Sequence, residues 1–168
     1  MDFLKLTADR YSCRKYSNKP IDQEYIDKIL MAGRTAPTAH NNQPQKILVV
    51  RSEEGLSLLD KCTVCQYHAP LAFIVCYDKK RAWTRDYDGK CSGDVDASIV
   101  ATYMMLEAKT LGIDSVWIMY FIPEAVTTEF GLPDDVVPVA ILYMGYAAEE
   151  ASSTHLKRRA LEEYVTYR

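Results

Sequence analysis

DVDASIVATYMMLEAKTL, residues 94–111, is the longest apolar and helix-prone stretch in the chain. Ile99, Met104 and Ala108 lie within it, and Gly112 follows at the position where a glycine commonly ends a helix. We therefore expect one long helix here, packed in the core, with the remaining elements arranged around it.

Segments with the character of strands lie on both sides of this helix. They contain runs of apolar and β-branched residues bounded by turn-forming ones, which is typical of buried strands. The four expected strands cover residues 47–50, 71–77, 115–121 and 137–146. Pro123, between the last two, suits the first turn of a short helix, because the N–H that proline lacks would have no partner there in any case.

Two further helices are expected nearer the N-terminus. Apolar residues recur at helical spacing from Ile21 to Leu30, behind a possible N-cap at Asp22, and we expect Gly33 to end this helix. A short helix is expected over residues 53–61. Helices thus alternate with about four strands, which predicts a layered α/β sandwich.

Length and charge exclude several classes of protein. The chain has 168 residues, of which 48% are hydrophobic, so one compact domain covering residues 1–168 is expected. The formal net charge of −3 gives no overall attraction to nucleic acid or to an anionic membrane surface. No apolar run approaches the roughly 20 residues that span a bilayer, and the N-terminus lacks the pattern of a signal peptide. We therefore expect a cytoplasmic protein that binds neither nucleic acid nor membrane.

Five cysteines form an odd set without a secretion signal, which favours reduced thiols over a disulfide framework. Cys62 and Cys65 make a C-x-x-C motif. A zinc site would need a second ligand pair, and a thioredoxin-like site would need the motif at a strand–helix turn. We expect two small residues at a helix end, with a thiol-redox role as the alternative.

Residues 10–14, RYSCR, alternate in a way that favours ligand binding. In an extended backbone Arg10, Ser12 and Arg14 project from the same side. Two guanidinium groups flanking a hydroxyl can hold a phosphate and a polyol, because the planar guanidinium donates paired, charge-assisted hydrogen bonds. The alternative is a solvated basic turn after the first helix.

Residues 37–44, PTAHNNQP, place three side-chain amides between two prolines. Amides both donate and accept hydrogen bonds, which is what the mixed edge of a heterocycle requires. The alternative is a turn in which the asparagines cap nearby backbone groups. His40, within this stretch, is expected to be a surface residue rather than a catalyst.

A second basic cluster, Lys157, Arg158 and Arg159, lies beside His155. Clusters of this kind are usually solvated surface, so this one gains meaning only if folding brings it near Arg10. The sequence contains no G-x-G-x-x-G fingerprint, Walker A loop, Ser-His-Asp arrangement or metal-ligand spacing. Hydrolase and kinase functions are therefore poor candidates.

Residues 10–14, followed about 25 residues later by APTAHNNQP at 36–44, closely resemble the two signature elements of the nitroreductase family. The resemblance continues through residues 93–99, 112–117 and 158–163, so it covers nearly the whole chain in the family's short form. It implies an α+β fold, a three-layer α/β/α sandwich around a mostly antiparallel mixed sheet. It also implies a homodimer that holds FMN in a crevice at the subunit interface.

The resemblance also implies particular cofactor contacts. The RYSCR element would hold the phosphate, the ribityl chain and the N1/O2 edge of FMN, and the 157–159 cluster would complete the phosphate site. The 37–43 loop would reach across from the partner subunit, and residues 117–120 would lie near flavin N5. The expected cofactor-binding residues are Arg10, Tyr11, Ser12, Arg14, Pro37, Thr38, Ala39, Asn41, Gln43, Trp117, Ile118, Met119, Tyr120, Lys157, Arg158 and Arg159.

The implied activity is transfer of electrons from NADH or NADPH through bound FMN to a small acceptor such as a nitroaromatic or a quinone. The flavin itself would carry the chemistry, so neither a catalytic acid or base nor a metal is expected. Met119 and Tyr120 stand where the family usually has a small or acidic residue, which bears on substrate preference. The alternatives are a non-catalytic flavin-binding or sensing module, a relative with dehalogenase or flavin-fragmentation chemistry, and a thiol-redox protein.

Overall fold

A four-stranded sheet forms the centre of the computed structural model, which describes residues 2–168. Its strands are β1 (Gln45–Val50), β2 (Leu71–Asp78), β3 (Asp114–Ile118) and β4 (Val136–Gly145). They lie in the order β1-β2-β4-β3, and each neighbouring pair is antiparallel. The one parallel element among the described residues is an isolated bridge between Ser12 and Ser115 at the free edge of β3.

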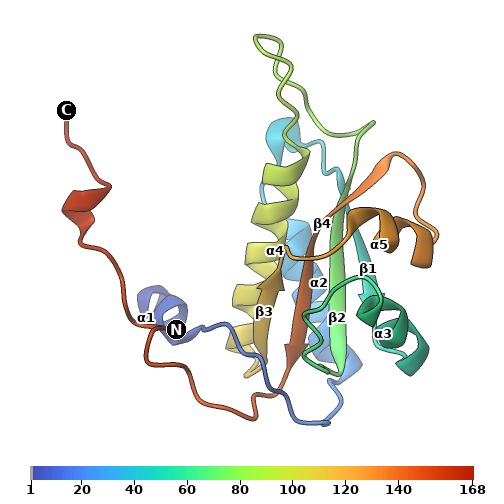
Figure 1. Ribbon diagram of the computed structural model, residues 1–168. Coiled ribbons are helices and arrows are strands. Elements are labelled where there is room, and N and C mark those ends of the chain that lie inside the picture. The colour runs from blue at the N-terminus through green and yellow to red at the C-terminus, as the bar shows by residue number, and fades with distance from the viewer. Residues whose placement is uncertain (1) are drawn as a thin grey trace.

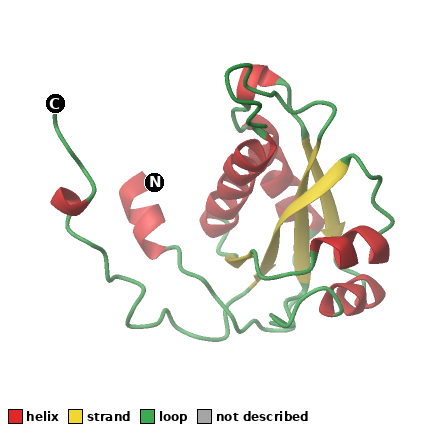
Figure 2. Cartoon of the chain, turned by 45° about the horizontal axis from the view of Figure 1, so that its top comes forward, coloured by secondary structure: helices red, strands yellow, loops and turns green. Residues whose placement is uncertain are grey.

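Helices cover both faces of this sheet, as Figures 1 and 2 show. α2 (Gln23–Thr35) and α4 (Gly93–Thr110) lie on one face, and α3 (Glu53–Asp60) and α5 (Pro123–Glu129) lie on the other. Each face has its own apolar core. The α+β class and the three-layer α/β/α sandwich expected from the sequence are confirmed. No helix in the described part of the chain is both long and apolar enough to cross a membrane.

The sequence of β2 has no alternation of polar and apolar residues, and its position in the sheet explains why. It lies between β1 and β4 with helices packed on both of its faces, and every residue from Leu71 to Tyr77 is buried. A strand buried on both faces has no solvent side on which polar residues could recur. A continuous apolar run is the consequence.

α4 forms the long core helix expected from its composition, and Gly112 ends it with a φ of +75°, as expected. The expectation for Gly33 was wrong, because α2 continues through this glycine to Thr35. A Cβ on Gly33 would lie 2.9 Å from Met104 Cγ on α4. Gly33 therefore allows α2 and α4 to approach closely rather than ending a helix.

The third strand is shorter than expected. β3 ends at Ile118 instead of Phe121, and the chain turns there, with the Phe121 N–H donating to the Met119 carbonyl at 3.0 Å. The turn is held from outside, because the Ile122 N–H donates to the Cys62 carbonyl at 2.9 Å. Cys62 directly follows the C-cap Lys61, and its N–H donates to the Leu59 carbonyl at 2.9 Å, so it lies at the end of α3 as expected, whereas Cys65 lies in the loop beyond.

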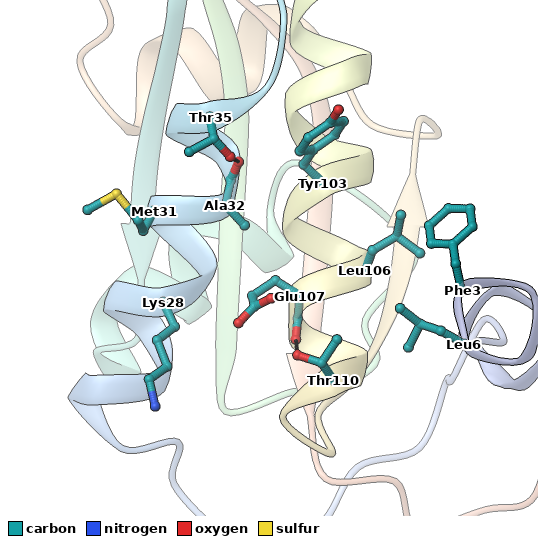
Figure 3. Close-up of a pocket in the computed structure, with 10 residues that line it drawn as sticks. All are labelled: Phe3, Leu6, Lys28, Met31, Ala32, Thr35, Tyr103, Leu106, Glu107 and Thr110. Atoms are coloured by element: carbon teal, nitrogen blue, oxygen red, sulfur yellow. Dashed lines mark hydrogen bonds between the residues drawn. The ribbon is translucent and has the colours of Figure 1, made fainter. Parts of the chain in front are cut away.

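α1 (Phe3–Asp9) and the segment after Gly145 project from the sandwich (Figures 1 and 2). α1 flanks a groove of about 610 Å³ that runs between α2 and α4 (Figure 3). Apolar side chains line much of this groove, beside Lys28, Thr35, Glu107 and Thr110, and Met31 and Tyr103 are 51% and 40% exposed. Within residues 2–168 the outer face of α2 and α4 therefore carries exposed apolar side chains along this groove.

Candidate cofactor site

The RYSCR element has the extended conformation expected from its alternation. α1 ends at Asp9, and the backbone then runs beside the edge of the sheet, where the Cys13 N–H donates to the Ser115 carbonyl at 3.1 Å. Further along, the Ser17 N–H donates to the Tyr146 carbonyl at 2.9 Å. The segment is thereby fixed against the start of β3 and the end of β4.

The C-terminal segment folds back against this element. The Tyr11 hydroxyl donates to the Glu149 carbonyl at 2.7 Å, and the Arg14 N–H donates to the Glu149 carboxylate at 2.7 Å. Beyond this, His155 Nε2 lies 2.6 Å from the carbonyl oxygen of Ala8 in α1. These contacts carry the tail past the N-terminal segment and bring Arg158 to the side of Arg10.

Together these segments form a cleft of about 250 Å³, which we call the basic cleft. Its lining residues are Arg10, Tyr11, Ser12, Arg14, Ser152, Thr154, His155 and Arg158. The sequence did not predict that Ser152 and Thr154 line the cleft. The only signal for them was the polar composition of the tail.

The electrostatics of the basic cleft favour an anion. Burial lowers the pKa of the Arg10 guanidinium, and the positive charge of Arg158 lowers it further. Within residues 2–168 no carboxylate forms a salt bridge with Arg10, Arg14 or Arg158. Like charges held together without a counter-ion are destabilised, and an anion between them would reverse that effect. The positive charges gathered in the cleft therefore favour an anion.

Only one residue of the second basic cluster lines the cleft. The Arg158 guanidinium donates to the carbonyl oxygens of His155 and Lys157, which holds it on the cleft side. Arg159 points elsewhere, with its guanidinium 5.4 Å from the centre of the Tyr164 ring, and Lys157 is exposed. The structure therefore distinguishes between three neighbours that the sequence left equivalent.

The 37–44 stretch, which we call the amide loop, is anchored to the start of α4. The Ala39 N–H donates to Asp96 Oδ1 at 2.8 Å, and the Ser92 hydroxyl donates to Asp96 Oδ2 at 2.7 Å. Asp96 is 2% exposed, and both oxygens of its buried carboxylate are engaged in these hydrogen bonds. A hydrogen bond inside the loop also stabilises it, because the Thr38 hydroxyl accepts the Gln43 N–H at 3.0 Å.

The backbone of the amide loop is strained. His40, Asn41 and Gln43 have φ angles of 52°, 54° and 50°, in the left-handed region that non-glycine residues seldom adopt. Each such residue costs on the order of 1–3 kcal/mol, and conformations of this kind cluster at functional sites. The side chains of Asn41 and Gln43 are exposed, whereas His40 stacks on Trp83 with ring centres 5.2 Å apart.

Within one chain the amide loop and the basic cleft lie far apart. The loop is bonded at the first turn of α4, whereas the cleft residue Tyr11 lies beside the last turn of this helix, with its ring centre 5.3 Å from Lys109 Nζ. A helix of 18 residues is about 27 Å long. A single FMN spans only on the order of 15–20 Å with bonds of about 1.5 Å. One chain alone cannot place both elements on the same cofactor.

The family model described as "Nitroreductase family" matches residues 7–67 and 65–146. The chain belongs to the nitroreductase family. A crystal structure of a nitroreductase family protein from Clostridium difficile 630 is 44% identical, with a TM-score of 0.95 over 99% of this chain and 98% of that one. An FMN-dependent nitroreductase from Clostridium difficile R20291 is 27% identical, with a TM-score of 0.81 over 98% of both chains. A relative from Archaeoglobus fulgidus, whose name joins NADH dehydrogenase with NAD(P)H nitroreductase, is 34% identical over 88% of this chain and 86% of that protein.

In this member of the nitroreductase family the 117–120 segment reaches the other end of β3 from the basic cleft. The side chains of Met119 and Tyr120 are 71% and 76% exposed. Trp117 and Ile118 face the two cores, and the indole N–H of Trp117 is buried without a partner among the described residues. Met119 and Tyr120 are therefore the most exposed residues of this segment, and Trp117 is partly exposed beside them.

Proposed function

We propose that this nitroreductase is an FMN-dependent oxidoreductase that passes electrons from NADH or NADPH to a small acceptor, such as a nitroaromatic or a quinone. The observation that carries the proposal is the basic cleft, in which Arg10 and Arg158 repel one another and lack a carboxylate partner. The relatives support the same assignment, since one is named as FMN-dependent and another for NADH and NAD(P)H.

The residues fit a flavin mononucleotide in a definite order. Arg10 and Arg158 would hold its phosphate, Ser12 its ribityl chain, and Arg14 the N1/O2 edge of the ring. Bound FMN would supply the hydride-accepting chemistry. The protein would supply orientation and charge, and Arg14 would stabilise the negative charge of the reduced ring.

We further propose a two-fold dimer in which the amide loop of one chain completes the site of the other. The roughly 27 Å between the two elements along α4 requires a second chain, and each chain then supplies half of two equivalent sites. The exposed apolar groove between α2 and α4 offers a surface for that second copy. Light scattering of the FMN-bound protein at low micromolar concentration tests this, and a monomeric mass with flavin bound would contradict it.

The proposed activity has a direct test. The purified protein, or the protein after addition of FMN, should show the visible absorption of oxidised flavin, and denaturation should release FMN. Addition of NADH or NADPH should bleach the spectrum, and a nitroaromatic or quinone should restore it. A protein that takes up no FMN contradicts the whole assignment, whereas one that binds FMN without turnover is a flavin-binding module. The five free cysteines suit the cytoplasm, where we place this activity.

A further inference from the structure

Two loops that are distant in sequence are joined beside the end of β3. One follows α3 and contains Thr63, and the other contains Tyr120 and leads into α5. The Thr63 hydroxyl donates to the Tyr120 carbonyl at 2.5 Å, and the Ile122 N–H donates to the Cys62 carbonyl at 2.9 Å. The loop after β3 is thus attached to the loop after α3 at two points.

The Thr63 hydroxyl is fixed in its orientation. Thr63 is only 6% exposed, and its oxygen accepts the Cys65 N–H at 3.0 Å. Because a carbonyl oxygen can only accept, the hydroxyl proton points to the Tyr120 carbonyl. Burial and two hydrogen bonds leave the side chain no other arrangement of similar energy.

The attachment determines which way the neighbouring N–H groups point. The Tyr120 carbonyl is held by Thr63, and the Phe121 N–H of the same peptide unit donates to the Met119 carbonyl. The N–H groups of Met119 and Tyr120 themselves donate to no acceptor in the described part of the chain. Both residues are mostly exposed, and their N–H groups lie in a turn that is held at Tyr120 and Ile122.

We propose that Thr63 is a positioning residue for the end of the flavin ring that carries N5, an inference that rests on the proposed FMN function. A backbone N–H can donate to N5 of oxidised flavin, which has a lone pair, but not to N5 of reduced flavin, which carries hydrogen. The contact therefore stabilises the oxidised form. Thr63 acts on this contact through the Tyr120 peptide without touching the ring.

The test compares Thr63→Val, which keeps the shape but removes the hydroxyl, with Thr63→Ser, which keeps the hydroxyl. Thr127→Val is the matched control, because the Thr127 hydroxyl bonds only to the Pro123 carbonyl within α5. In the FMN-bound protein, Thr63→Val should reduce the preference for oxidised flavin about threefold to tenfold, which raises the two-electron midpoint potential by about 15–30 mV. Thr63→Ser and Thr127→Val should leave the potential near the wild-type value.

Hydrogen exchange of the FMN-free protein tests the attachment independently of the cofactor. Amides of residues 119–122 should exchange faster in Thr63→Val than in the wild type, with Thr63→Ser close to the wild type. An unchanged potential in Thr63→Val overturns the proposal, as does a Thr63→Ser variant that behaves like Thr63→Val. If Thr63→Val does not fold, Thr63→Ala replaces it in the same comparison. Failure of the wild type to bind FMN would instead refute the underlying function.

Discussion

Replacing Arg158 by methionine should weaken FMN binding without weakening the unliganded fold. Arg158 adds a positive charge beside the half-buried Arg10, and no carboxylate in residues 2–168 forms a salt bridge with either residue. Removing Arg158 therefore relieves a repulsion when the cleft contains no anion. With phosphate bound, the same change removes a charge-assisted hydrogen bond, which contributes about 1.5–3 kcal/mol.

Because about 1.4 kcal/mol corresponds to a factor of ten, the dissociation constant of FMN should rise about ten- to 150-fold. The assay is titration of FMN into the cofactor-free protein, followed by the quenching of flavin fluorescence, together with thermal unfolding of the cofactor-free protein. Arg159→Met is the matched control, since Arg159 is the adjacent arginine but lies over the Tyr164 ring. That variant should bind FMN with near wild-type affinity.

Three results would refute the electrostatic reasoning. The first is an Arg158→Met variant that binds FMN as tightly as the wild type. The second is an equal loss of affinity in Arg159→Met, because the effect would then come from net charge rather than from the cleft. The third is a clear fall in the melting temperature of cofactor-free Arg158→Met, which would make Arg158 a structural residue.

Other variants probe the ring contact and the fold. Arg14→Met should lower the two-electron potential of bound FMN by about 30–60 mV with little loss of affinity, whereas Arg10→Met should mainly lose affinity; the opposite assignment would show that the N-terminal segment lies differently on the flavin. Gly93→Ala should lower the free energy of unfolding in urea by about 1–3 kcal/mol, because the added methyl would overlap the Tyr77 ring; an unchanged midpoint contradicts this packing. Burial raises the pKa of the Cys76 thiol to about 12. Above the unfolded-state value of about 8.5, the unfolded chain loses this proton first, so stability falls by about 1.4 kcal/mol per pH unit towards pH 12. Cys76→Ala should make that fall shallower in unfolding curves measured above pH 9, and an identical slope would be inconsistent with the burial.

The elements that the sequence predicted best are those whose environment is uniform along their length. β2 lies between the two helical layers and is buried along nearly its whole length, and α4 turns one side to the core, so their apolar composition follows largely from this burial. Gly33 and the end of β3 were mispredicted because partners distant in sequence determine them. Glycine is needed at position 33 because Met104 approaches it closely. β3 ends just before a turn that is held by the hydrogen bond from the Ile122 N–H to the Cys62 carbonyl.

In the candidate site, too, some features could be predicted from the sequence and others depend on contacts between distant residues. Residue types identified the basic clusters and the amide loop, because charge and amide content are visible in a sequence. The route of the tail was not visible, since it depends on the contacts of Tyr11 and Arg14 with Glu149. That route decides that Arg158 rather than Lys157 or Arg159 lines the basic cleft.

Under the proposed function, β3 sets the length of the cofactor site. The basic cleft is bonded to its first residues through Cys13, and the turn held by Thr63 follows its last residue. A strand of five residues spans about 17 Å, so the cleft and the turn lie at the two ends of this edge strand. The two ends then act on opposite redox states, because Arg14 favours the reduced ring at N1 and the turn favours the oxidised ring at N5. Because N1 and N5 are only three bonds apart in the ring, the Arg14 side chain has to extend from the start of β3 towards the turn, and the potential of the bound flavin is a balance between these two neighbouring contacts.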